Sequence, residues 1–294
     1  MDRKNFLRKS LLGTGMLFSG GSLLHALAGS RGSLKLYSQY DDHVVGFNHI
    51  ENTKSEIMSN KVLHKADTRG HARHGWLESY HTFSFANYYN PERMNFGVLR
   101  VLNDDTVAPS MGFSTHAHDN MEIISIPLEG DLEHKDSMGN VAVIRNGDIQ
   151  VMSAGTGIRH SEFNKNTDKS VKFLQIWLFP NERNVTPRYD QLTLRAEDRK
   201  NRLQQILSPV PEDEGVWIHQ DAWFHLGQLD KGVNLEYSMK KRGNGVYVFL
   251  LSGNALVDGT ELKSRDGLGI WDVEKIRISA VEQSEILLME VPMS

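Results

Sequence analysis

The chain of 294 residues contains no cysteine. This absence excludes disulfide bonds, thiolate catalysis, and zinc or iron–sulfur sites that need sulfur ligands. An excess of positive charge is also absent, because 33 Lys and Arg stand against 37 Asp and Glu, a formal net charge of −4. Nothing in this balance indicates a nucleic-acid-binding protein. The 13 histidines remain, so any bound metal ion must be held by nitrogen and oxygen atoms.

Near the N-terminus, a short basic segment is followed by a long stretch without charged residues. Four basic residues at positions 3, 4, 8 and 9 precede the stretch from Ser10 to Gly29, which contains no Asp, Glu, Lys or Arg and includes Ala26-Leu27-Ala28. This order is typical of an export signal peptide over residues 1–28, and Arg3-Lys4 is a variant of the paired arginines of twin-arginine signals. The alternative, a membrane anchor, is disfavoured because many glycines and serines interrupt the apolar stretch. We expect a periplasmic protein without a membrane span after cleavage, or a cytoplasmic one if the signal is not used.

The remainder of the chain has the pattern of β-structure. Short apolar segments such as Phe96–Leu102, Glu122–Leu128 and Val246–Leu251 alternate with turn residues, and Asp258-Gly259 is a typical hairpin turn. Strands of this length and spacing predict an all-β protein built from sandwiches or barrels. Only Leu194–Leu207 has a plausible helical pattern.

Changes in composition along the chain predict its domain boundaries. A polar stretch follows the expected signal, and a segment rich in proline and charge separates two halves that are rich in strands. We therefore expect a polar arm at residues 29–61, a first β domain at 62–180, a linker with a short helical segment at 181–215, and a second β domain at 216–294.

The residues that carry chemistry gather in the first domain. On one strand, His116, His118 and Glu122 would share a face, with the two histidines roughly 6.6 Å apart at roughly 3.3 Å per residue. Further along the chain, His160 and Glu162 repeat the alternate spacing after a glycine-rich turn. Two such pairs that face a common interior would supply three imidazoles and one or two carboxylates.

This donor set favours a borderline divalent metal such as iron, manganese, nickel or copper over tetrahedral structural zinc. A single His-x-His in a β-rich protein is usually a surface or hydrogen-bonded pair. The second His-x-Glu makes a metal site the better interpretation. The alternation of side chains along a strand does not decide whether Glu122 or Glu162 is the ligand, because both would point inward.

Several motifs carry a resemblance to a known family. The order Gly112, His116-x-His118-x₃-Glu122, Gly130, Gly147-Asp148 and His160-x₃-Asn164 resembles the two short motifs of the cupin superfamily. Longer segments resemble the pirin family over Lys65–Phe179, among them His81–Tyr89, Phe96–Val101, Met121–Ile124 and Leu132–His134. The resemblance implies a bicupin, in which two jelly-roll-like β-barrel domains pack face to face and the first holds one metal ion.

By this resemblance the metal ligands are His116, His118, His160 and Glu162. They would hold one divalent ion, normally Fe²⁺, with manganese, nickel, copper or zinc as alternatives, and Glu122 becomes a neighbour of the site that serves as a base or orients a ligand. The second domain has no His-x-His. We expect it to hold no metal and to help close one side of the pocket.

The resemblance also implies an activity. Several pirin-like proteins are similar to quercetin 2,3-dioxygenases, which use dioxygen to open the central ring of a flavonol and release carbon monoxide. A small aromatic substrate would then sit against interior aromatics such as Phe113. Two alternatives stay open: a redox-sensing cupin that binds a protein partner without turnover, and a cupin whose metal only stabilises the fold. No nucleic-acid partner is expected.

Overall fold

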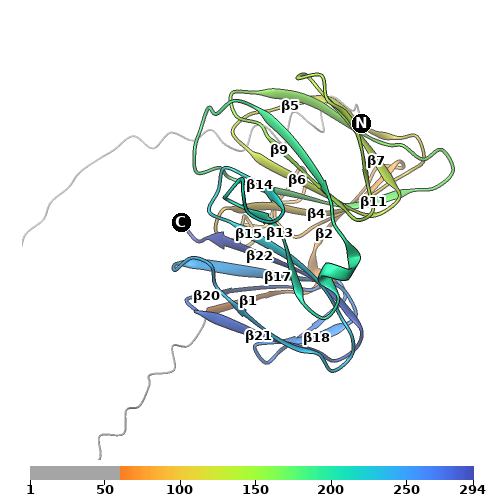
Figure 1. Cartoon of the computed structure of the whole chain (residues 1–294). Coiled ribbons are helices and arrows are strands. Elements are labelled where there is room, and N and C mark those ends of the chain that lie inside the picture. Colours follow the sequence, from red (N-terminus) through yellow and green to blue (C-terminus); the bar gives the residue numbers. More distant parts are fainter. Residues whose placement is uncertain (1–59) are drawn as a thin grey trace, which may run out of the picture.

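The computed structural model describes residues 60–294. The expected export signal and almost all of the polar arm lie outside the described residues. The described part consists of strands with two short 3-10 helices, η2 (Ala66–Thr68) and η3 (Ala196–Arg199) (Figure 1). None of its helices is long and apolar enough to cross a lipid bilayer.

The first domain is a sandwich of two antiparallel sheets. Its seven-stranded sheet has the order β12-β9-β6-β11-β4-β3-β2, and its four-stranded sheet has the order β5-β10-β7-β8. The strands are β2 (Gly70–Arg73), β3 (Leu77–His81), β4 (Leu99–Val107), β5 (Gly112–His118), β6 (Glu122–Glu129), β7 (Asp131–Asp136), β8 (Val141–Arg145), β9 (Asp148–Ser153), β10 (Ile158–Asn164), β11 (Val171–Leu178) and β12 (Arg188–Thr193).

The second domain repeats this arrangement. Its sheets have the orders β1-β20-β17-β22-β15-β13-β14 and β16-β21-β18-β19, so β15 to β22 pair with one another as β4 to β11 do. The strands are β1 (Asn60–His64), β13 (Leu203–Ser208), β14 (Val216–Trp217), β15 (Trp223–Leu229), β16 (Asn234–Ser238), β17 (Asn244–Ser252), β18 (Asn254–Val257), β19 (Thr260–Lys263), β20 (Gly267–Trp271), β21 (Lys275–Ala280) and β22 (Ser284–Pro292). The predicted all-β bicupin architecture is confirmed.

The chain crosses between the domains in ways that the sequence did not predict. β1 contains the last two residues expected in the arm and the first three expected in the first domain, yet it pairs with β20 of the second domain. β12 lies in the expected linker and pairs with β9 of the first domain. Each domain therefore contains an edge strand from outside its predicted boundaries, and β1 ties the two halves together.

The helix predicted at Leu194–Leu207 is wrong. Only η3 is helical within this range, and residues 203–208 form β13, which pairs with β15. Leu194, Ile206 and Leu207 are buried in the apolar cluster between the domains. Sheet pairing and burial thus override the local helical pattern, as tertiary contacts commonly do.

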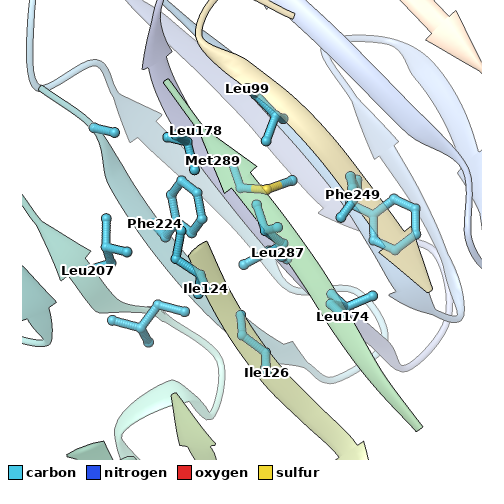
Figure 2. Packing of buried hydrophobic residues seen from close by; sticks show 14 of the residues in the cluster. Leu99, Ile124, Ile126, Leu174, Leu178, Leu207, Phe224, Phe249, Leu287 and Met289 are labelled. Atoms are coloured by element: carbon cyan, nitrogen blue, oxygen red, sulfur yellow. The ribbon is translucent and has the colours of Figure 1, made fainter. Parts of the chain in front are cut away.

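The two domains pack through their seven-stranded sheets. Figure 2 shows Ile124, Leu174 and Leu178 of the first domain beside Phe224 and Met289 of the second, all of them buried in one apolar cluster. Because strand side chains alternate between faces, the opposite faces of β6 and β11 line the interior of the first domain. The interface between the domains therefore supports the outer face of a sheet whose inner face borders the metal-binding residues described below.

We predict that Phe224→Ala destabilises the whole protein. Phe224 is fully buried at the interface, and replacing a buried Phe by Ala costs about 3–5 kcal/mol through lost burial and the cavity that remains. Tyr89, which is 73% exposed, provides the matched control, and Tyr89→Ala should cost less than about 0.5 kcal/mol. Chemical denaturation monitored by fluorescence and circular dichroism measures both values. Equal losses in the two variants, or separate unfolding of the domains in the unchanged protein, would contradict a shared core.

Candidate metal centre

Three histidine rings converge inside the first domain, on its four-stranded sheet. His116 and His118 lie on β5, and His160 on β10 lies directly opposite His116 in the antiparallel ladder. The ring centroids are 4.4, 4.8 and 5.0 Å apart. One ligand nitrogen from each ring lies within 4.8 Å of the other two. The pairing of β5 with β10 thus brings together the two histidine motifs of the sequence.

The hydrogen bonds of these rings leave nitrogen lone pairs unused. Nδ1 of His116 lies 2.8 Å from the carbonyl oxygen of Ser114. Because a carbonyl only accepts, Nδ1 carries the proton and Nε2 keeps its lone pair. Nε2 of His118 and both ring nitrogens of His160 are buried without a hydrogen-bond partner. Buried polar atoms are almost always satisfied in folded proteins, so these unpaired nitrogens indicate a ligand-binding position.

Burial keeps the three rings uncharged. It lowers the pKa of His118 to about 3, with a further contribution from the charge of His116. Burial, followed by the neighbouring imidazoles, lowers the pKa of His160 well below its usual value, and burial also lowers the pKa of His116. A neutral imidazole offers a lone pair, whereas a protonated one repels a cation. The rings are therefore in the form that binds metal at neutral pH.

Glu162 lies two residues after His160 on the same face of β10 and is buried. Its Oε1 accepts a 3.0 Å hydrogen bond from Ser125 Oγ, and its Oε2 accepts a 3.2 Å hydrogen bond from Gln175 Nε2. Burial raises the pKa of Glu162 to about 7, and the two hydrogen bonds oppose this shift. Within residues 60–294, the group whose ligand atoms converge consists of the three histidines without this carboxylate. Glu162 is nevertheless held beside them by two donors.

Glu122 does not share a face with the two histidines of β5, so this prediction is wrong. The chain turns at Asn120, which has a φ of 45°, and β6 begins at Glu122 in the other sheet. Glu122 lies opposite Ser153 and Leu178, and Leu178 belongs to the cluster between the domains. The Glu122 carboxylate therefore faces the second domain. Its Oε2 accepts a 2.7 Å hydrogen bond from Ser153 Oγ, whereas its Oε1 is buried without a hydrogen-bond partner.

The second domain contacts the seven-stranded sheet on the face that points away from the histidines. His219 follows β14 of that domain, and its backbone lies near the Glu122 carboxylate. Nearby, the Arg188 guanidinium lies 3.9 Å from the Trp217 ring centroid and donates a hydrogen bond to the Trp217 carbonyl. These contacts lie at the outer face of the seven-stranded sheet, where they fix the sheet's position against the second domain.

A fourth buried imidazole lies beside the three. The His134 ring centroid is 5.3 Å from that of His160, but Nε2 of His134 is 3.1 Å from Asp136 Oδ2. His81 is similarly engaged, with Nδ1 2.9 Å from the Asn103 side-chain oxygen. Hydrogen bonding therefore accounts for one nitrogen of each ring.

The sequence interpretation missed Ser125, Gln175 and Trp177. Ser125 and Gln175 hold the Glu162 carboxylate, and the Trp177 ring packs 4.9 Å from that of His118. Ser125 and Gln175 are polar residues in the apolar central parts of β6 and β11. A polar residue at an inward position of such a strand is the signal that would have found them.

The geometry fits a divalent metal ion. Three neutral imidazoles with unpaired nitrogens converge in a buried region, and an oriented carboxylate lies two residues along the same strand face. Nitrogen donors with an oxygen donor suit iron, nickel, copper, manganese or zinc better than calcium or magnesium, which prefer all-oxygen sites.

Comparison with known proteins agrees with this geometry. Residues 62–178 match the family model described as Pirin, and residues 205–291 match the one described as quercetinase C-terminal cupin domain. The chain is 44% identical over 230 residues to a quercetin 2,3-dioxygenase of Escherichia coli (78% of this chain, 98% of that protein), and 39% identical over 225 residues to a pirin-like protein of Caulobacter vibrioides (76% and 96%). A crystal structure of a bacterial pirin from Escherichia coli in complex with nickel(II) matches with a TM-score of 0.76 and 42% identity over 80% of this chain and 100% of that chain. The chain belongs to the pirin family.

Proposed function

We propose that the protein is a metal-dependent dioxygenase that opens a flavonol-like aromatic substrate, with Fe²⁺ as its metal. The observation that carries the proposal is the convergence of three imidazole rings, each of which offers one ligand nitrogen within 4.8 Å of the others. The similarity to proteins named quercetin 2,3-dioxygenase supports the substrate class.

In this proposal the metal is held by His116, His118 and His160, with Glu162 as the fourth ligand. A bound borderline metal would chelate the deprotonated hydroxy-ketone of a flavonol and activate it toward dioxygen. Ionised Glu162 would lower the net charge of the site by one. A nickel complex of a relative supports metal binding by this family, while our choice of iron comes from the resemblance found in the sequence.

The surrounding residues orient the ligands and exclude water. Ser125 and Gln175 restrain the Glu162 carboxylate, as supporting hydrogen bonds do around metal ligands generally. The ring of Trp177 covers one side of His118, and Phe113 lies opposite Glu162 in the β5–β10 ladder. These aromatic rings would give a planar substrate an apolar surface close to the histidines.

We predict that metal affinity rises with pH up to about 7 and then levels off. The pKa of Glu162 is about 7, so below that pH a metal ion must displace a proton from the carboxylate before it can bind. Burial disfavours the protonated form of all three imidazoles, so we expect the carboxylate to supply the released proton. Calorimetric titration of nickel(II) in buffers of different ionisation enthalpy measures the protons released, and we expect close to one at pH 6.

Glu162→Gln should weaken binding and abolish this proton release. His71 is exposed and lies on β2, outside the converging group, so His71→Ala is the matched control and should leave both quantities unchanged. If Glu162→Gln released as many protons as the unchanged protein, Glu162 would not be a ligand.

We predict that the iron-loaded protein consumes quercetin and dioxygen in equal amounts and produces carbon monoxide. His160→Ala should lose this activity together with the metal, because it removes one of three converging nitrogens, whereas His71→Ala should retain both. Absorbance of the flavonol, an oxygen electrode and carbon monoxide trapping measure the reaction. A protein that binds one metal ion per chain but is inactive with every divalent metal would rule out the dioxygenase and leave the redox-sensing and fold-stabilising alternatives.

We also propose that residues 1–28 direct export to the periplasm. The basic start, the uncharged stretch and Ala26-Leu27-Ala28 support this location. Cell fractionation followed by mass spectrometry of the mature N-terminus tests it. A full-length protein that stays in the cytoplasm would overturn the proposal.

A further inference from the structure

The second domain contains a cavity of about 350 Å³ on its own sandwich. It is bounded by β15, β16 and the chain beside them, and its lining includes Arg202, Leu203, His225, Leu235, Tyr237 and Lys240. None of these residues belongs to the metal centre of the first domain, so the cavity needs an explanation of its own.

The internal repeat relates β16, which borders this cavity, to β5 of the metal centre. In the first domain His118 lies opposite the buried Ile158, and in the second Tyr237 lies opposite the buried Ile276. With these pairs aligned, Leu235 takes the place of His116. At the next two inward positions, which lie on β21, apolar residues likewise replace the metal-binding residues of β10.

Those two positions hold Ile278 and Ala280, where β10 holds His160 and Glu162. The second domain thus has apolar residues and one phenol where the first has its converging donors. Ile278 and Ala280 are packed in the apolar core of the second domain. The cavity lies beside them, along the edge strand β16, where Leu235 and Tyr237 border it.

His225 supplies this cavity with an unused hydrogen-bonding group. Its side chain is only 4% exposed, and Nδ1 is buried without a hydrogen-bond partner. The ring packs edge-on against Tyr237, with centroids 4.9 Å apart. The Tyr237 hydroxyl donates to the Glu290 carboxylate at 2.7 Å and makes no hydrogen bond to Nδ1 of His225. An unpaired polar group this deeply buried is uncommon in a folded protein.

The charges around the cavity favour an anion. Lys240 makes no ion pair within 4.0 Å in the described part of the chain, whereas Arg202 pairs with Asp198 at 2.8 Å. Glu236, the one carboxylate among the lining residues, pairs with Lys275 at 3.0 Å. Burial, and then the charge of Lys240, lower the pKa of His225 to about 4, so the ring is neutral and carries one N–H.

Two further carboxylates lie close by and are already engaged. Glu290 accepts backbone hydrogen bonds from Lys240 and Lys241 as well as the Tyr237 hydroxyl and the Asn244 amide. Asp213 is exposed and bound by neighbouring donors, and it acts on Lys240 only through its charge. Lys240 therefore remains the cation available to a ligand.

We propose that this cavity binds a small organic carboxylate. The anionic group would pair with the Lys240 ammonium and accept a hydrogen bond from the His225 ring. Its apolar body would lie against Leu203, Leu235 and the Tyr237 ring. The site is separate from the metal centre and does not depend on the proposed dioxygenase activity.

Calorimetric titration of the nickel-loaded full chain with benzoate tests this proposal, with benzamide as the uncharged analogue. Lys240 is exposed, so Lys240→Met should fold normally and weaken benzoate binding about tenfold, the loss typical of one charged hydrogen bond. His225→Leu should weaken it similarly. Lys231, which is exposed and outside the cavity, provides the matched control, and Lys231→Met should bind benzoate within about twofold of the unchanged protein. Benzamide should bind at least about tenfold more weakly than benzoate.

A His160→Ala variant separates this cavity from the metal centre. Benzoate binding that persists in this variant supports the second-domain site, and binding that disappears would assign benzoate to the metal and overturn the proposal. The proposal also fails if Lys240→Met binds benzoate as tightly as the unchanged protein, if benzamide binds equally well, or if no saturable binding occurs up to about 10 mM.

Discussion

The antiparallel pairing of β5 with β10 is the constraint on which the metal centre depends. It sets His160 opposite His116, and the two-residue repeat of a strand then brings His118 to the same group. Burial keeps all three rings neutral, since the charged form of a buried imidazole is costly. The fold therefore positions three lone pairs before any ligand arrives. A shift of one residue in this register would turn the histidines of one strand away from the other.

The rest of the molecule stabilises that pairing indirectly. The sheet that faces β5 and β10 carries Ser125 and Gln175 on its inner side, where they hold Glu162. On its outer side the same sheet buries Ile124 and Leu174 against the second domain. β1, which precedes the first domain in the chain and pairs with β20 of the second, joins the two halves. The second domain thus contributes to the metal centre by fixing the sheet behind it.

Much of this arrangement could be predicted from the sequence, and the failures have physical causes. The alternation of His116 with His118, and of His160 with Glu162, predicts side chains on one face wherever each pair lies within a single strand. The same reasoning fails for Glu122, because Asn120 takes a positive φ and places Glu122 in a different sheet. The helical pattern near Leu207 fails because sheet pairing outweighs local propensity. Long-range pairings such as that of β1 leave no local signal in the sequence.

The most direct test of the account is X-ray absorption spectroscopy of the nickel-loaded protein. We predict a first shell of nitrogen and oxygen atoms with outer-shell scattering from three imidazole rings, and from two rings in His116→Ala. A spectrum without imidazole scattering, or one that His116→Ala leaves unchanged, would contradict metal binding by the converging histidines.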